Sequence, residues 1–272
     1  MGGGVSGIAG KHVVILGGGG IGTALAYSLQ DAGAVVSVGD CNEARLDELR
    51  QCGVYAFPVD VADADDVEES LQCVCDRTGS LWGLCVTAAI VHRGHDIIET
   101  APKQFRQIMD INFFGTLHAN QVAARMMIAN AVGGRIINWS SVNAVGGTPG
   151  GAAYASSKAA VETLSMSLAV ELAHYGVTVN VIRPGSIDTP LISNIDAAAK
   201  RNDVARIPLG SWGSGEDIAH ACTMLLDPSA GWITGSVVTV DGGMLAAVGR
   251  PSNVRPVPPR EPAPVGEPHA GQ

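Results

Sequence analysis

The stretch VVILGGGGIGTALAYSL at residues 13–29 decides the fold. Its first four residues, VVIL, are apolar and mostly β-branched, as in a buried strand. Four consecutive glycines follow at 17–20, and from Thr23 onward small and apolar residues repeat with helical spacing. This order of strand, glycine turn and helix predicts the first half of a βαβ unit.

The glycines of this turn match the fingerprint of a dinucleotide-binding site. Gly17, Gly19 and Gly22 fit the pattern G-x-G-x-x-G, in which absent side chains allow a tight turn and a close approach of backbone to a pyrophosphate. The pattern alone is weak evidence. An apolar run at 34–38, followed by Asp40 eighteen residues after Gly22, supplies the structural context that the motif requires.

Asp40 predicts which dinucleotide binds. Its carboxylate can accept hydrogen bonds from both ribose hydroxyls, and it would repel a 2′-phosphate. No Arg or Lys lies in the glycine turn or directly after Asp40, so we expect NAD rather than NADP as the cofactor. The alternative role for Asp40 is a helix N-cap, because Asn42 and Glu43 begin a helical stretch that runs to residue 50.

The rest of the chain alternates strands with helices. Apolar runs at 54–59, 84–88, 135–139 and 177–182 are the further expected strands. Such alternation predicts an α/β fold of the Rossmann type, a doubly wound parallel sheet with helices on both faces, in a single domain. Ligands of this fold bind at the carboxyl ends of the strands. Four residues at such ends are expected to share one crevice: Asp60, Ala88, Ser141 and Gly185.

Composition and charge limit the partners. The 272 residues are 46% hydrophobic and carry a formal net charge of -9, so no basic surface for nucleic acid is expected. No apolar run is long enough to cross a membrane, and no export signal precedes the first strand. With six cysteines spread along the chain, the protein is expected in the cytoplasm. No metal site is expected at His92 and His95, because no carboxylate or Cys nearby in the sequence completes a preformed ligand set with them.

The Rossmann-type domain is expected to span residues 11–249, with a flexible segment at each end of the chain and a lid within the domain. Residues 1–10 are rich in glycine and predict a flexible leader. Residues 250–272 contain seven prolines and no aromatic residue, and they predict a disordered tail. Residues 187–206 are rich in small side chains and are expected to form a lid over the substrate crevice.

A proton-transfer centre is predicted near the middle of the chain. Tyr154 and Lys158 are four residues apart, so their side chains lie on one helix face, where the ammonium can favour the phenolate. Tyr ordinarily ionises near pH ~10, and bringing its pKa to neutrality takes about 4 kcal/mol of differential stabilisation. Ser141, thirteen residues before the tyrosine, ends a strand and can join the pair. The alternative is an amphipathic helix that merely carries both residues.

Taken in order, these residues resemble the classical short-chain dehydrogenase/reductase family over residues 11–243. The resemblance implies that Tyr154 exchanges a proton with the substrate oxygen, that Ser141 hydrogen-bonds this oxygen, and that Lys158 holds the nicotinamide ribose. It also implies that Asn112 holds a water in the proton relay, the alternative being a structural amide bonded to nearby backbone. The shared landmarks are the glycine turn, Asp40, Asp60-Val61, Asn112, Ser140-Ser141, Tyr154 with Lys158, Pro184-Gly185 with Thr189, and Val240-Asp241-Gly242-Gly243.

The resemblance further implies two sets of contact residues. The expected cofactor contacts are Gly17, Gly19, Gly20, Ile21, Gly22, Asp40, Asp60, Val61, Ala88, Tyr154, Lys158, Pro184, Gly185, Ile187 and Thr189. The expected substrate contacts are Ser141, Asn143, Tyr154 and Leu191.

Two departures from the family pattern concern the cofactor turn. The usual Thr-Gly-x-x-x-Gly-x-Gly is one residue shorter here, with Leu16 nearest the expected threonine. The usual Asn-Asn-Ala-Gly after the fourth strand is replaced by Val-Thr-Ala-Ala at 86–89. We expect Thr87 to supply part of the bracing that the missing amides would give.

The leading hypothesis is an NAD-dependent oxidoreductase that moves a hydride between nicotinamide and a secondary alcohol or ketone. Apolar residues such as Leu191 and the absence of Arg and Lys at 189–198 favour a neutral, largely apolar small-molecule substrate. One alternative is a 3-oxoacyl carrier-type reductase, disfavoured because an NADPH-linked enzyme would need basic residues near Asp40. A non-catalytic dinucleotide-sensing regulator is the other. By resemblance, helices at 103–127 and 154–175 are expected to form a homotetramer or dimer.

Overall fold

A computed structural model describes residues 7–92, 96–147, 149–189 and 197–247 of the chain. The expected tail at 250–272 lies outside the described residues. So do positions 1–6 of the expected leader and positions 190–196 of the expected lid, which include Leu191.

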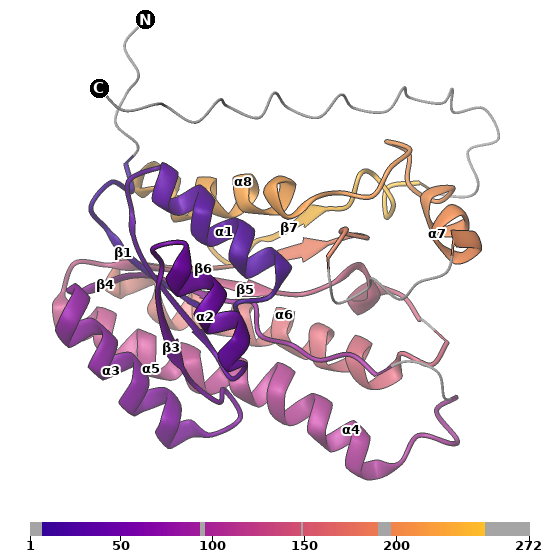
Figure 1. Ribbon diagram of the computed structural model, residues 1–272, viewed down its shortest axis with the longest axis horizontal. Helices are drawn as coiled ribbons and strands as arrows, with labels where there is room; N and C mark the ends of the chain where they lie inside the picture. Colours follow the sequence, from indigo (N-terminus) through magenta and orange to yellow (C-terminus); the bar gives the residue numbers. More distant parts are fainter. Residues whose placement is uncertain (1–6, 93–95, 148, 190–196, 248–272) are drawn as a thin grey trace, which may run out of the picture.

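The core of the molecule is a seven-stranded sheet in the order β3-β2-β1-β4-β5-β6-β7 (Figure 1). Every neighbouring pair is parallel, which confirms the predicted doubly wound fold in a single domain. The strand order reverses between β1 and β4, where such folds bind ligands. The strands are β1 (His12–Leu16), β2 (Val35–Asp40), β3 (Tyr55–Pro58), β4 (Leu81–Val86), β5 (Gly134–Trp139), β6 (Val177–Pro184) and β7 (Val237–Val240).

Helices cover both faces of the sheet. Figure 1 shows α1 and α8 side by side over one face, and α3, α5 and α6 against the other. Each face buries its own apolar cluster, as expected for strands covered on both sides. The helices are α1 (Gly20–Asp31), α2 (Glu43–Gln51), α3 (Ala64–Thr78), α4 (Pro102–Met109), α5 (Gly115–Asn130), α6 (Ala152–Leu172), α7 (Ala197–Val204) and α8 (Gly215–Leu226).

Short polar side chains begin several of these helices. Asn42 caps α2 by accepting the amide of Arg45, so Asn42 rather than Asp40 is the N-cap. Asp63 caps α3 in the same way, and Ser214 begins α8 with a capping box.

The fourth strand and the helix after it differ from the prediction. Strand β4 spans Leu81–Val86 rather than 84–88, because the amides of Thr87 and Ala88 both turn back to the carbonyl oxygen of Leu16, at 2.8 Å. The helix expected at 103–127 is interrupted by a π-helical segment, η1 (Asp110–Phe114), between α4 and α5. This segment contains Asn112.

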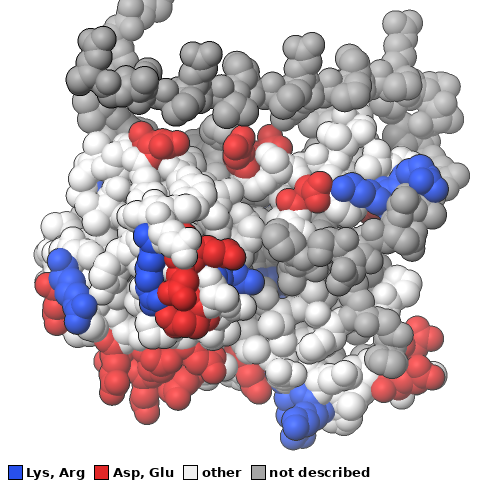
Figure 2. All heavy atoms as spheres, in the orientation of Figure 1, with Lys and Arg blue, Asp and Glu red and all other residues white. Residues whose placement is uncertain are grey.

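The surface follows the acidic composition. Figure 2 shows acidic side chains gathered over α3, which carries Asp65, Asp66, Glu68, Glu69 and Asp76. Among the described helices, none combines the length and the apolar character needed to cross a membrane.

Candidate active site

The glycine turn between β1 and α1 leaves room for a phosphate group. Gly17 has φ +109°, and a Cβ there would lie 2.5 Å from the amide nitrogen of Ala88. A Cβ at Gly22 would lie 1.9 Å from the carbonyl oxygen of Gly17, so neither position accepts a side chain. Gly19 caps α1 without a side chain and faces open space, which leaves the first amides of the helix available to an anion. These residues fit a dinucleotide.

Thr87 braces this shortened turn. Its Oγ1 lies 2.6 Å from the carbonyl oxygen of Gly17 and 3.1 Å from that of Leu16, and it donates toward both. The hydroxyl therefore joins the end of β1 to the loop after β4. The two departures from the family pattern meet here, since the residue that replaces an amide is the one that holds the shorter turn.

Asp40 lies at the end of β2 with its carboxylate already engaged. Oδ2 accepts the amide of Gly18 at 2.7 Å and Nη1 of Arg45 at 2.9 Å, and Oδ1 accepts the amide of Asn42 at 2.9 Å. The expectation that no basic residue stands near Asp40 is therefore wrong. Arg45 is five residues further along the sequence, but the first turn of α2 brings its guanidinium back to the carboxylate.

Two of the predicted cofactor contacts, Asp60 and Val61, lie after β3. Asp60 is exposed, and its Oδ1 accepts the amide of Ala62 at 2.9 Å. Val61 is buried, and a Cβ on Gly115 would lie 2.8 Å from its Cγ2, so α5 begins closely packed on this segment. The half-buried Ala88 faces the glycine turn from the loop after β4.

Ser141, Tyr154 and Lys158 come together at the carboxyl end of β5. Lys158 is 2% exposed, and its Nζ donates to the carbonyl oxygen of Trp139 at 2.9 Å and lies 5.8 Å from the centre of the Tyr154 ring. Burial lowers the pKa of Lys158 to about 8. Ser141 Oγ accepts the amide of Asn143 at 3.2 Å, and this bond begins a short 3₁₀ segment.

Asn112 is a buried amide whose side chain is used by the protein. Oδ1 accepts the amide of Ile90, and Nδ2 donates to the carbonyl oxygen of Ile90 and to Ser157 Oγ. Its own carbonyl oxygen accepts the hydroxyl of Thr116. Asn112 thus joins the loop after β4 to α6 next to Tyr154, and only unused lone pairs of its two oxygens remain for a relay water.

The segment after β6 approaches the sheet edge closely. A Cβ on Gly185 would lie 2.8 Å from the Cα of Asp241, and Pro184 is buried. Ile187, another of the predicted cofactor contacts, is 5% exposed and packs into the apolar core. Thr189 is half-buried.

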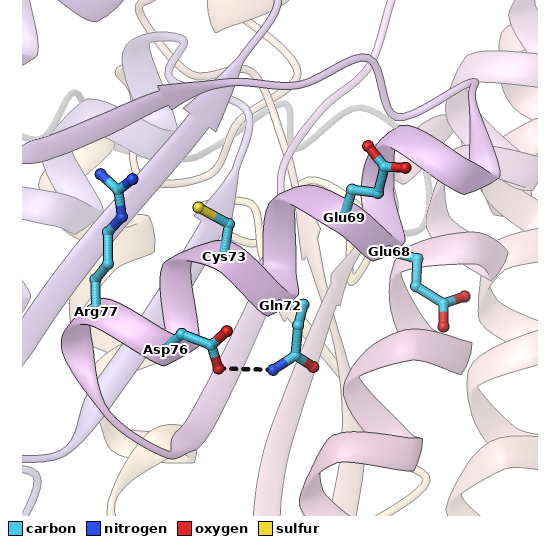
Figure 3. Close-up of a pocket in the computed structure, with 6 residues that line it drawn as sticks. All are labelled: Glu68, Glu69, Gln72, Cys73, Asp76 and Arg77. Atoms are coloured by element: carbon cyan, nitrogen blue, oxygen red, sulfur yellow. Dashed lines mark hydrogen bonds between the residues drawn. The ribbon is translucent and has the colours of Figure 1, made fainter.

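Two hollows lie outside these residues. A small one of about 100 Å³ lies next to the start of α6 and is lined by His92, Thr100, Gln104, Ile108, Gly150, Ala152 and Ala153. A larger one of about 590 Å³ lies on α3 and is lined by Glu68, Glu69, Gln72, Cys73, Asp76 and Arg77 (Figure 3). No candidate cofactor or catalytic residue lines the larger one. Within the described ranges, no three His, Cys, Asp or Glu residues gather to hold a metal ion.

Three charged residues near the candidate site were missed at the sequence level. Arg45 contacts Asp40, while Glu162 and Arg183 pair beside Lys158. A spacing signal exists for Glu162, because it follows Lys158 by four residues on the same helix. Arg183 has no such signal, since only the β6 strand brings it to α6.

The chain is similar to known reductases along most of its length. Residues 16–245 match the family model described as enoyl-(acyl carrier protein) reductase. The 3-oxoacyl-acyl-carrier-protein reductase FabG of Rickettsia conorii is 34% identical over 239 residues, which are 88% of this chain and 98% of the relative. The protein of the same name from Staphylococcus aureus is 34% identical over 232 residues, or 83% of this chain and 94% of the relative.

Solved structures agree with this similarity. A gluconate 5-dehydrogenase from Burkholderia cenocepacia, in complex with NADP and tartrate, has a TM-score of 0.82 and 31% identity, covering 88% of this chain and 97% of that chain. A short-chain type dehydrogenase/reductase from Mycobacterium ulcerans has a TM-score of 0.83 and 30% identity, covering 88% and 91%.

Proposed function

The chain belongs to the short-chain dehydrogenase/reductase family, and on this basis we propose that it transfers a hydride between a nicotinamide dinucleotide and a ketone or secondary alcohol. The observation that carries the proposal is the environment of Lys158. Its ammonium is buried beside the Tyr154 ring, and no carboxylate in the described residues pairs with it. Such a cation favours a phenolate next to it and gives Tyr154 the means to exchange a proton.

Each residue of the centre has a separate task in this proposal. In the reductive direction Tyr154 donates its phenolic proton to the carbonyl oxygen of the substrate. Ser141 already accepts the amide of Asn143, so its hydroxyl hydrogen can bond the same oxygen. Lys158 stabilises the phenolate left behind and holds the nicotinamide ribose.

The dinucleotide would lie along the carboxyl edge of the sheet. The nicotinamide, when bound, supplies or accepts the hydride. The turn at 17–22 would hold the pyrophosphate, Asp40 the adenosine ribose, and Asp60 with Val61 the adenine. The loop after β4 contributes Ala88, and the segment after β6 contributes Pro184, Gly185, Ile187 and Thr189 to the nicotinamide end.

A Tyr154→Phe variant tests the mechanism directly. We expect its turnover to fall more than about 100-fold, the scale of general acid–base catalysis, while NADH binding measured by fluorescence changes little. Tyr175→Phe is the matched control, because Tyr175 is 45% exposed in the short 3₁₀ segment that follows α6 and its replacement should leave turnover unchanged. Unchanged turnover in Tyr154→Phe would refute the mechanism. A wild-type protein that binds NADH but reduces no ketone would support a dinucleotide sensor.

For the substrate we propose a 3-oxoacyl thioester as the first candidate. The names of the curated relatives point to this class, and the presence of Arg45 beside Asp40 removes the objection to an NADPH-linked reductase. Arg201 on α7 and Arg206 just after it are exposed, in the part of the expected lid that the structure describes. Exposed cations at this position favour an anionic carrier attached to the acyl group.

Comparing the KM of a thioester that carries phosphates with that of one that lacks them tests this candidate against a neutral ketone. We expect acetoacetyl-CoA to be reduced with a lower KM than the acetoacetyl thioester of N-acetylcysteamine, which lacks the phosphates. The double variant Arg201→Gln with Arg206→Gln should raise the KM for the CoA ester and leave that of the small thioester unchanged. Reduction of cyclic or aliphatic ketones in preference to both thioesters would instead favour the neutral, largely apolar substrate.

A further inference from the structure

Beside the candidate catalytic residues lies a largely buried ion pair in which a guanidinium and a carboxylate form two parallel hydrogen bonds. Arg183 on β6 donates from Nε to Glu162 Oε1 at 2.8 Å and from Nη2 to Oε2 at 2.7 Å. The side chains are only 16% and 10% exposed. Two parallel bonds between a guanidinium and a carboxylate fix both distance and orientation, unlike a single contact between exposed charges.

The pair extends to two further strands. Ser140 at the end of β5 donates from Oγ to Glu162 Oε1 at 2.5 Å, and Arg183 Nη1 donates to Thr239 Oγ1 on β7 at 3.3 Å. Glu162 lies on α6, one turn after Lys158. One ion pair therefore joins helix α6 to β5, β6 and β7 at their carboxyl ends.

These contacts lie next to each candidate catalytic group. Ser140 directly precedes Ser141, and its amide donates to the carbonyl oxygen of Ile182 on β6. Tyr154, Lys158 and Glu162 follow at intervals of four on one face of α6. The relative position of Ser141 and Tyr154 thus depends on how α6 is held against the end of β5, and the ion pair is a direct link at that point.

We propose that Glu162 and Arg183 form a positioning clamp that holds Tyr154 and Lys158 on α6 at the correct distance from Ser141 on β5. The clamp touches neither substrate nor cofactor, and it acts through Ser140 and the helix. This inference rests on the proposed function, since it assigns a role relative to those three residues. A misplacement of about 1 Å at a reacting centre can cost about 100-fold in rate.

The test separates positioning from stability with two variants. Glu162→Met with Arg183→Met removes both charges together, which avoids leaving one buried charge unpaired and is often neutral for stability. Ser140→Ala leaves the ion pair in place and removes the bonds of the Ser140 hydroxyl to Glu162 and to the carbonyl oxygen of Lys158. In both we expect kcat to fall at least about tenfold, with the Kd for NADH within threefold of the wild type and full binding stoichiometry. Tyr154→Phe in the same assay establishes that the proposed chemistry is operating.

Ser165→Ala is the matched control. Ser165 is another buried serine between α6 and β5, where its Oγ accepts Asn138 Nδ2 at 3.0 Å, but it lies two helical turns beyond Lys158. This variant should lower the melting temperature and leave kcat within twofold. If Tyr154→Phe is inactive while Ser140→Ala and the double Met variant keep wild-type kcat, the clamp is refuted and the proposed function stands. Equal losses of kcat in Ser165→Ala would also refute it.

Discussion

Asp40 and Arg45 form an ion pair of unequal exposure at the cofactor end of β2. The Asp40 side chain is 6% exposed and that of Arg45 is 39% exposed. Both lone pairs of Oδ2 are used by Gly18 and Arg45, which leaves Oδ1 with one free lone pair for a ribose hydroxyl. The outward guanidinium meanwhile has donors that suit a phosphate. Asp40 therefore favours NAD, from whose ribose hydroxyl it can accept a hydrogen bond, whereas Arg45 favours the 2′-phosphate of NADP.

Replacing Arg45 is expected to shift this choice toward NAD. In Arg45→Gln the ratio of kcat/KM for NADPH to that for NADH should fall about tenfold, equivalent to about 1.4 kcal/mol. Asp40→Asn should shift the ratio the other way, because it removes the charge that repels a 2′-phosphate. Arg50→Gln is the control, since Arg50 pairs with Glu43 and Asp47 instead. An unchanged ratio in Arg45→Gln would show that the guanidinium has no part in selection.

The buried ammonium of Lys158, which the proposed mechanism uses, lowers the stability of the folded protein. Its pKa is lowered from the ordinary 10.5 to about 8 by burial. Between these two values the unfolded chain binds more protons than the folded one, so stability rises with pH through this window. Below pH 8 both states are protonated, and the full cost of burying the charge remains.

A Lys158→Met variant is expected to lose activity and gain stability at pH 7. The gain is about 1–3 kcal/mol, as the shift in pKa implies after allowance for the lost bond to Trp139. Urea denaturation of both proteins at pH 7 and pH 9.5 measures it. The advantage of the variant should shrink at the higher pH. A variant less stable than the wild type at both pH values would contradict the prediction.

At the scale of elements, the place of the glycine turn and its bracing by Thr87 were predictable, whereas the ion pairs of Asp40 and Glu162 were not. The sequence pattern at 13–29 located β1, the turn and α1, because the periodicity and the glycines are local signals. The two ion pairs depend instead on how neighbouring elements pack, for which the sequence carries no local signal. Arg45 reaches Asp40 only after α2 has folded back, and Arg183 reaches Glu162 only through the pairing of β5 with β6.

Thr87 allows the support of the turn to be tested. Thr87→Val keeps the shape and removes the hydroxyl, so the carbonyl oxygen of Gly17 loses its donor. We expect a loss of about 1–2 kcal/mol in the free energy of unfolding and weaker NADH binding by fluorescence titration. Thr87→Ser retains the hydroxyl and should restore both. If Val and Ser variants bind NADH equally well, the hydroxyl does not hold the turn.

At the scale of the whole molecule, the sheet order brings distant residues to one edge. The candidate site residues lie at or just after the carboxyl ends of parallel strands: the glycine turn, Asp40, Asp60, Ser141 and Gly185. This arrangement was predictable once the alternation of strands and helices was recognised. The π-helical segment around Asn112 was not predictable. The Asn112 side chain bonds to Ile90 only when the loop after β4 has reached its folded position. Sequence patterns thus predicted which edge of the sheet carries the candidate site residues. Tertiary packing decides which of their atoms remain free to bind a ligand.

The outer face of α6 provides the test of assembly. Met166 is 45% exposed and Val170 is 80% exposed, one helical turn apart, on a helix expected from the family resemblance to lie between subunits. Burying such side chains is favourable by about 1.5–3 kcal/mol each, whereas a carboxylate there would be desolvated without a partner. Val170→Glu should therefore lower the mass measured by light scattering. Val132→Glu is the control, because Val132 is 59% exposed outside this helix. A monomeric wild type, or an unchanged mass in Val170→Glu, would exclude this face as the interface.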